Sequence, residues 1–192
     1  MNKRRFLGSA AIAAMLPSVA TSAAETSKSG PGLLTVSGAI GKTNRGPVDP
    51  TLDQLFAKHK IKFEKAYVFD PEALRRLPAV QIQPTLEYDA KVHSLSGPLL
   101  SSVLEAAGVS PDRQAMLGLR AVDGFVVGVS MADARAYRMI VAVEMDGSPL
   151  ALGGLGPQWA IYDADRLPAF KDKPLKTRYG LCPWGLFSIE VT

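Results

Sequence analysis

Cysteine and histidine are scarce in this chain of 192 residues, which has one cysteine and two histidines. A single cysteine, Cys182, excludes an intramolecular disulfide, so the fold depends on a hydrophobic core for its stability. With only His59 and His93 beside it, the chain cannot assemble the four ligands of a Cys/His zinc site. We therefore expect no metal site, and we expect a core built from the 47% of residues that are hydrophobic.

The usual sequence signatures of hydrolases and nucleotide-binding enzymes are also absent. A Ser/His/Asp triad would need His93, because His59 falls on a predicted amphipathic helix, and no nucleophile-elbow pattern accompanies it. The glycines of 153–156 lack both the lysine of a phosphate-binding loop and the spacing of a dinucleotide-binding turn. Cys182 stands beside Pro183, where a small buried thiol is more common than a nucleophile. We assign no catalytic residue.

Residues 1–24 have the three parts of a secretory signal peptide. Basic residues at 3–5 are followed by an apolar stretch that Pro17 interrupts, and small residues lead up to Ala24. The stretch is shorter than the roughly 20 apolar residues needed to span a bilayer, which disfavours a membrane anchor. We expect cleavage and a mature protein in a bacterial periplasm. The basic start leaves both the general secretory route and the twin-arginine route open.

Removal of this segment changes the charge balance of the protein. The chain has 22 Lys plus Arg and 18 Asp plus Glu, and three of the basic residues and none of the acidic ones lie in 1–24. The mature protein would keep 19 basic residues against 18 acidic ones. Because phosphate backbones are bound by basic surfaces, this balance disfavours a nucleic-acid partner.

The rest of the chain is expected to form a flexible lead at 25–32 and one mixed α+β domain over 33–192, because many short strands alternate with a few helices. Asp123-Gly124 between two β-rich segments predicts a hairpin turn. The helix after Asp49-Pro50 should present Leu52, Leu55 and Phe56 on one apolar face. We predict further helices after Asp70-Pro71, over 98–107 and after Ser130, and strands near 33–40, 66–69, 79–82, 116–122, 125–129, 139–144, 159–162 and 186–191.

Several short motifs follow one another in an order and spacing that is more specific than any one of them. The chain thereby resembles the short periplasmic members of the sulfite-oxidase-type molybdopterin-binding fold, over roughly 33–191 apart from extra sequence between about 47 and 70. The motifs are Leu34 to Gly38, Leu95 to Leu100, Asp123-Gly124-Phe125, Val141 to Gly147, Gly156 to Tyr162 and Trp184 to Val191.

The resemblance implies mixed sheets around a central cleft that holds a pterin. It does not imply molybdenum, because the cysteine that ligates the metal in that family precedes the segment of Gly97-Pro98, and 81–96 contains no cysteine. Cys182 lies near the last strand, which is the wrong place. Short relatives also carry Arg-Asp-Lys where this chain has Gly-Gly-Leu at 153–155, and Trp-Gln-Leu where it has Trp-Gly-Leu at 184–186. These changes weaken the case for an anionic ligand.

Relatives without the cysteine suggest capture of a reduced pterin or a similar flat heterocycle, reported to a membrane-bound signalling partner. Such a ligand needs an aromatic face for stacking and a carboxylate for its two adjacent donors. Trp159 and Trp184 are the candidate faces and Glu87 or Asp123 the candidate carboxylate, although a tryptophan is often a core residue and Asp-Gly is itself a turn signal. His93 and Arg178 complete the set of candidate ligand-binding residues, although an arginine at such a position is more often solvated.

The sequence is consistent with three hypotheses of function. The first is a non-catalytic periplasmic binding protein for a pterin-like molecule. The second is a molybdopterin-dependent oxidoreductase that ligates the metal without cysteine or depends on a partner subunit. The third is an interaction module whose cleft has degenerated.

Overall fold

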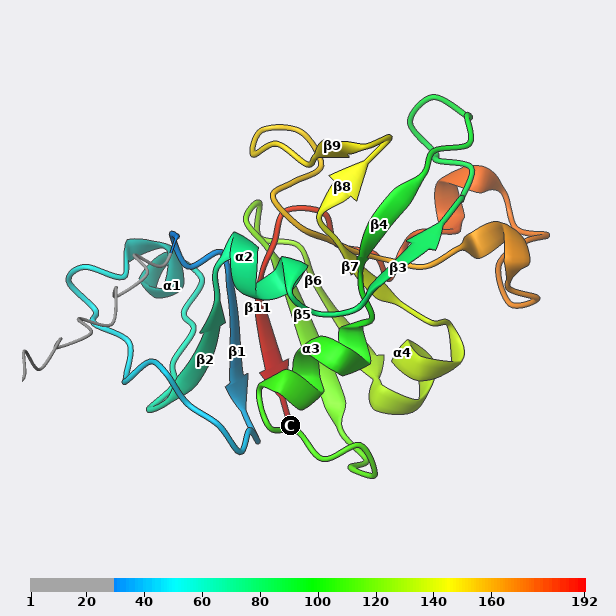
Figure 1. Ribbon diagram of the computed structural model, residues 1–192. Coiled ribbons are helices and arrows are strands. Elements are labelled where there is room, and N and C mark those ends of the chain that lie inside the picture. Colours follow the sequence, from blue (N-terminus) through cyan, green and yellow to red (C-terminus); the bar gives the residue numbers. More distant parts are fainter. Residues whose placement is uncertain (1–29) are drawn as a thin grey trace, which may run out of the picture.

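The computed structural model describes residues 30–192 (Figure 1). The predicted signal peptide at 1–24 and most of the predicted lead at 25–32 lie outside the described residues. The strands are β1 (Leu34–Gly38), β2 (Ala66–Phe69), β3 (Ala79–Ile82), β4 (Leu95–Pro98), β5 (Met116–Ala121), β6 (Val126–Ser130), β7 (Ile140–Ala142), β8 (Glu144–Met145), β9 (Ser148–Pro149), β10 (Trp159–Ile161) and β11 (Leu186–Val191). The helices are α1 (Gln54–Lys58), α2 (Pro71–Arg75), α3 (Leu100–Ala106) and α4 (Met131–Ala136), with 3₁₀ turns η1 (Ala164–Arg166) and η2 (Leu175–Thr177).

The strands of the described region form three sheets. The largest has the order β2-β1-β11-β5-β6, in which β1 and β11 pair in parallel and the other pairs are antiparallel. A second sheet has the order β3-β4-β8-β9, and β7 pairs with β10. The first and last strands of the domain therefore lie side by side in the largest sheet, and the chain between them builds the rest.

The core lies on one face of the largest sheet. In Figure 1, α2 and α3 lie in front of this sheet, and α4 lies to the right of α3. Leu100, Val103 and Leu104 of α3 are fully buried in one hydrophobic cluster with Leu119 of β5 and Ile189 of β11. The helical spacing predicted over 98–107 is thus confirmed, and its apolar stripe packs on a sheet as expected.

The extra sequence at about 47–70 covers part of the opposite face. A β-bulge lies between Leu186 and Ser188 of β11, and the Phe187 ring is 5.7 Å from the ring of Phe56 in α1. Of the residues predicted to form an apolar face on this helix, Phe56 is buried, but Leu52 is 79% and Leu55 42% exposed. The prediction for those two leucines is wrong, because α1 is one short turn that begins at Gln54 and packs through one aromatic ring.

Two other helix starts agree with their sequence signals. The Asp70 carboxylate accepts a hydrogen bond from the Ala73 amide at 2.6 Å, which caps α2. The Ser130 hydroxyl oxygen accepts one from the Asp133 amide at 2.9 Å, which caps α4. In both cases a polar side chain satisfies an amide that the first helical turn leaves unpaired.

The strand predicted over 139–144 is divided in the structure. Ile140–Ala142 pairs with β10, whereas Glu144–Met145 pairs with β4 and β9. Gly97 of β4 makes this arrangement possible, because a Cβ at that position would overlap the Val141 carbonyl group. The sequence shows an apolar run over 139–143 followed by Glu144, and tertiary pairing divides this segment into two strands of different sheets.

The described residues form one domain of the α+β class, with several sheets and a few short helices. Within residues 30–192, no helix is both long and apolar enough to cross a membrane.

Candidate functional site

Three separate parts of the chain surround a pocket of about 260 Å³. We call it the Glu87–Trp184 pocket. The loop between β3 and β4 contributes Glu87 and Tyr88. The β5–β6 hairpin contributes residues between 121 and 125, and the segment from η2 to β11 contributes residues between 176 and 184. The full lining is Glu87, Tyr88, Ala121, Asp123, Phe125, Lys176, Tyr179, Gly180, Cys182, Pro183 and Trp184.

Glu87 is the half-buried acid of this pocket. Among residues 30–192, none of the ion pairs involves its carboxylate. Lys176 is the cation in the lining. A carboxylate without a partner at the wall of a pocket is free to accept hydrogen bonds from a bound molecule.

Asp123 lies at the exposed rim and also has a structural task. Its Oδ1 accepts a hydrogen bond from the Phe125 amide at 2.9 Å, which closes the turn between β5 and β6. Gly124 has a φ of 98°, a conformation that glycine adopts without strain. The predicted hairpin turn is therefore confirmed, and Asp123 uses one of its oxygens to hold it.

Aromatic side chains line the mouth of the pocket. Trp184 is half-buried, whereas Tyr88 is 56% and Phe125 46% exposed. Burial of part of the Tyr88 ring, and next the negative charge of Glu87, raise the pKa of its phenol. The phenol therefore stays protonated at neutral pH, and it can donate a hydrogen bond beside the Glu87 carboxylate.

Cys182 and Tyr179 form the buried floor. Burial raises the pKa of the Cys182 thiol to about 12, so the thiolate does not form near neutral pH. The Tyr179 hydroxyl donates to the Thr85 carbonyl oxygen at 2.7 Å, which ties the floor to the β3–β4 loop. The floor is thus neutral and fixed.

Trp159 and Arg178 lie outside the lining of this pocket. Trp159 is 1% exposed, and its indole N–H donates to the Cys182 carbonyl oxygen at 2.9 Å. Arg178 donates to Asp165 at 2.6 Å and to the Lys173 carbonyl oxygen at 2.8 Å. Both side chains therefore support the walls, as a core tryptophan and as part of an ion pair.

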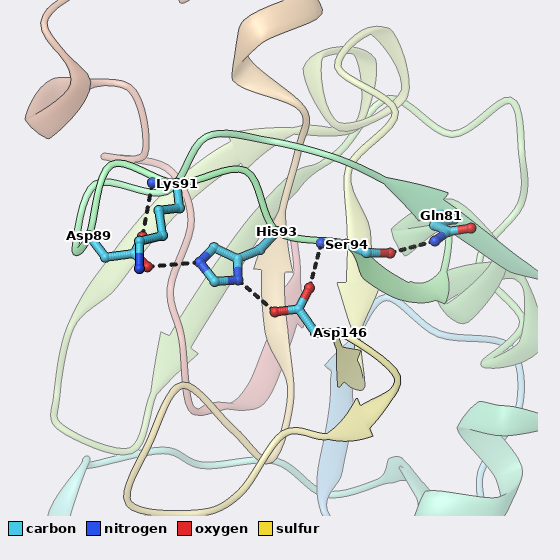
Figure 2. Close-up of polar contacts among 6 residues, drawn as sticks. All are labelled: Gln81, Asp89, Lys91, His93, Ser94 and Asp146. Atoms are coloured by element: carbon cyan, nitrogen blue, oxygen red, sulfur yellow. Dashed lines mark hydrogen bonds and ion pairs between the residues drawn. The ribbon is translucent and has the colours of Figure 1, made fainter.

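His93 also lies outside the pocket lining, between two acids (Figure 2). Its Nδ1 is 2.7 Å from Asp146 Oδ2 and its Nε2 is 3.0 Å from Asp89 Oδ2. The hydrogen bond to Asp146, and next the one to Asp89, raise the pKa of the imidazole. Because both ring nitrogens are engaged, neither is free to act as a general base.

The structure therefore brings Glu87, Asp123 and Trp184 together and places the other three candidates elsewhere. Eight pocket residues were not among the candidates, and those with an aromatic or charged side chain are Tyr88, Phe125, Lys176 and Tyr179. Phe125 belongs to one of the motifs of the resemblance and Tyr88 directly follows the candidate Glu87, so their positions in the sequence were a usable signal. Lys176 and Tyr179 come from a Pro/Lys-rich segment in which no sequence pattern distinguishes them.

The side chains that line the pocket are not suited to ligate molybdenum, the metal found in enzymes of the family that the sequence resembles. The molybdenum centre of that family requires a cysteine thiolate, and the only cysteine here is a buried, protonated thiol on the pocket floor. Within residues 30–192, no group of three His, Cys, Asp or Glu side chains is placed to hold a metal ion. The carboxylates of Asp89 and Asp146 contact opposite nitrogens of the His93 ring and do not converge on one point.

Comparison with solved structures identifies the fold. The sulfane dehydrogenase SoxCD from Paracoccus pantotrophus matches 83% of this chain with a TM-score of 0.55 and 14% sequence identity. The matched region spans 38% of the SoxCD chain, so this protein corresponds to a minor part of it. No family model and no curated protein matches the sequence. The likeness shows a single sulfite-oxidase-type domain, as the order of motifs predicted.

Proposed function

We propose that the protein binds a pterin-like molecule in the Glu87–Trp184 pocket and catalyses no reaction on it. The observation that carries the proposal is the unpaired Glu87 carboxylate, which lines the same pocket as the Trp184 and Tyr88 rings. The amino-pyrimidinone edge of a pterin presents two adjacent N–H donors, which match the two oxygens of one carboxylate. Its flat ring system stacks on aromatic side chains.

The size and charge of the pocket favour a small heterocycle over a large cofactor. A volume of about 260 Å³ is slightly below the range of about 300–1,000 Å³ that is typical of small-molecule sites. Two fused rings fit such a space better than a cofactor with a long side chain. Lys176 adds a cation that can donate to a ring carbonyl next to the edge held by Glu87.

We further propose export to the periplasm and a membrane-bound signalling protein as the partner. The three-part pattern of residues 1–24 supports export. Phe125 and Val126, which are 46% and 45% exposed beside the pocket mouth, support a contact surface there, since exposed apolar groups often mark interaction sites. A partner at this rim would sense directly whether the pocket is filled.

The second candidate is a molybdopterin-dependent oxidoreductase, which the likeness to a sulfane dehydrogenase favours. It differs from the first in its requirement for a metal ligand, for which the protonated Cys182 is poorly suited.

Calorimetric titration of the protein with tetrahydrobiopterin under anaerobic conditions tests the proposal. We expect saturable one-to-one binding, accompanied by a change in the fluorescence of Trp184. An absence of heat and of any fluorescence change at millimolar ligand would reject pterin binding. Stoichiometric molybdenum in the protein from its native compartment would favour the oxidoreductase.

A further inference from the structure

The loop that carries Glu87 and Tyr88 is a compact unit with two kinds of attachment. At its base, the Thr85 amide donates to Asp165 Oδ2 at 2.7 Å, and Leu86 is 2% exposed within the core. Thr85 and Val92 form an isolated β-bridge. The base is therefore anchored by buried contacts.

The tip of the loop has weaker support. The Leu86 amide donates to the Lys91 carbonyl oxygen at 2.9 Å, and the Ala90 amide donates to the Leu86 carbonyl oxygen at 3.0 Å. Ala90 has a φ of 58° and is exposed, as are its neighbours from Tyr88 to Val92. These two bonds link an exposed segment to the buried Leu86, and exposed segments held by few contacts open easily, so these bonds alone would leave the tip mobile.

His93 joins this tip to the second sheet. Its Nε2 contacts Asp89, two residues after Glu87, and its Nδ1 contacts Asp146 in the turn between β8 and β9 (Figure 2). Each carboxylate is itself oriented by an amide: Lys91 donates to Asp89 Oδ1 at 3.0 Å and Ser94 donates to Asp146 Oδ1 at 2.9 Å. The ring is therefore held at both nitrogens by acceptors that are already fixed.

This geometry selects the charged form of the ring. A neutral imidazole has one nitrogen with a lone pair, and that lone pair would face a carboxylate oxygen here. An imidazolium donates from both nitrogens, and each bond is strengthened by charge. The arrangement is a clamp that closes only when His93 is protonated.

We propose that His93 is a positioning residue for the Glu87–Trp184 pocket, holding the β3–β4 loop between Asp89 and Asp146 so that Glu87 and Tyr88 face the ligand. The inference rests on the proposed function of that pocket and adds a regulation to it: the affinity for the ligand falls when the clamp opens. His93 does not touch the ligand and acts through the loop.

The pH window of the clamp follows from the groups that face His93. These are Asp89 and Lys91 in the loop and Asp146 in the β8–β9 turn. The pKa of His93 is raised above its ordinary value of 6.5, so its contribution is complete below that pH and is lost as the pH rises through the higher folded value. The pKa values of both aspartates are lowered from 3.8, so their contribution is lost only in more acidic solution. The clamp is therefore closed throughout pH 3.8 to 6.5, and it opens as the pH rises through the folded pKa of His93, which lies above 6.5.

The affinity test uses two variants and one matched control. In the wild type we expect the Kd for tetrahydrobiopterin to rise about threefold to tenfold as His93 deprotonates, with a midpoint equal to the pKa of His93 measured by NMR. His93→Gln should bind with the weaker, high-pH affinity throughout. Asp146→Asn should move the affinity midpoint and the NMR pKa of His93 downward together, because an amide accommodates the neutral ring. The control is His59→Gln, the other histidine of the chain, which should keep the wild-type profile.

A second measurement needs no ligand. Hydrogen exchange in the free protein should show that His93→Gln lowers the protection of the Leu86 and Ala90 amides about threefold to tenfold at acidic pH, while β11 keeps its protection. Equal protection in His93→Gln and wild type would refute the positioning role, and so would a ligand affinity that ignores the titration of His93. If no pterin binds the wild type, the proposed function fails, and the exchange experiment still decides whether His93 holds the loop.

Discussion

Replacement of Glu87 by glutamine is the most informative perturbation of the pocket. The side chain keeps its length, but one carboxylate oxygen becomes an NH₂ group that matches only one of the two donors of a pterin edge. Loss of one charge-assisted hydrogen bond and an unmatched donor should cost about 1 to 3 kcal/mol of binding free energy. The Kd for tetrahydrobiopterin should therefore rise about 5-fold to 150-fold.

Glu87 is suited to this test because it makes none of the ion pairs among residues 30–192 and is only half-buried. The substitution should leave the thermal midpoint within a few degrees of the wild type. Glu105→Gln on the exposed side of α3 is the matched control and should bind as the wild type does. Unchanged affinity in a folded Glu87→Gln protein, measured by calorimetry, would mean that this carboxylate does not contact the ligand. Asp123 would then be the carboxylate to test.

Three further predictions concern the buried thiol, the sheet contact and the N-terminus. Cys182→Ser should bind tetrahydrobiopterin within a few-fold of the wild type, because the protonated thiol acts as a packing group; lost binding in a folded variant would revive a role for the thiol in ligation. Gly97→Ala should lower the free energy of unfolding by about 1 to 3 kcal/mol in urea titrations, since the new methyl group would overlap the Val141 carbonyl; an unchanged unfolding midpoint would contradict the close contact. Mature protein should begin near Ala24 or Glu25 on N-terminal sequencing, and a retained Met1 in exported material would contradict cleavage.

The elements that could be predicted from the sequence have signals that do not depend on distant residues. β11 was predicted at its observed bounds, because Leu186–Val191 is rich in apolar and β-branched residues and follows the turn at Gly185. The α2 and α4 starts were predictable because Asp70 and Ser130 satisfy amides three residues away. Local chemistry decides all three cases.

The predictions are wrong where contacts between residues far apart in the sequence determine the local structure. The apolar spacing of Leu52 and Leu55 predicted a buried helix face, but this segment contacts Phe187 of β11 through the rings of Phe56 and His59. The predicted strand at 139–144 gave no sign that its two ends would pair with different sheets. Periodicity reports which side chains prefer burial and not which strand lies opposite.

The same limit applies to the candidate site. Asp123 and Trp184 could be proposed because they belong to motifs of the resemblance, and Glu87 because it lies in 81–96, where that family has its metal ligand; the structure places all three in one pocket. Trp159 begins β10 and Arg178 follows η2, but their side chains turn to the Cys182 carbonyl and to Asp165. The sequence indicates which segments approach the cleft, whereas side-chain direction depends on partners that only the folded chain supplies.

Native mass spectrometry of the protein isolated from its own compartment tests the central claim most directly. The proposed function predicts a protein that carries one small pterin without molybdenum, or an empty protein that takes up one tetrahydrobiopterin on incubation. A bound molybdenum-containing cofactor would contradict the claim, and so would an empty protein that takes up no pterin.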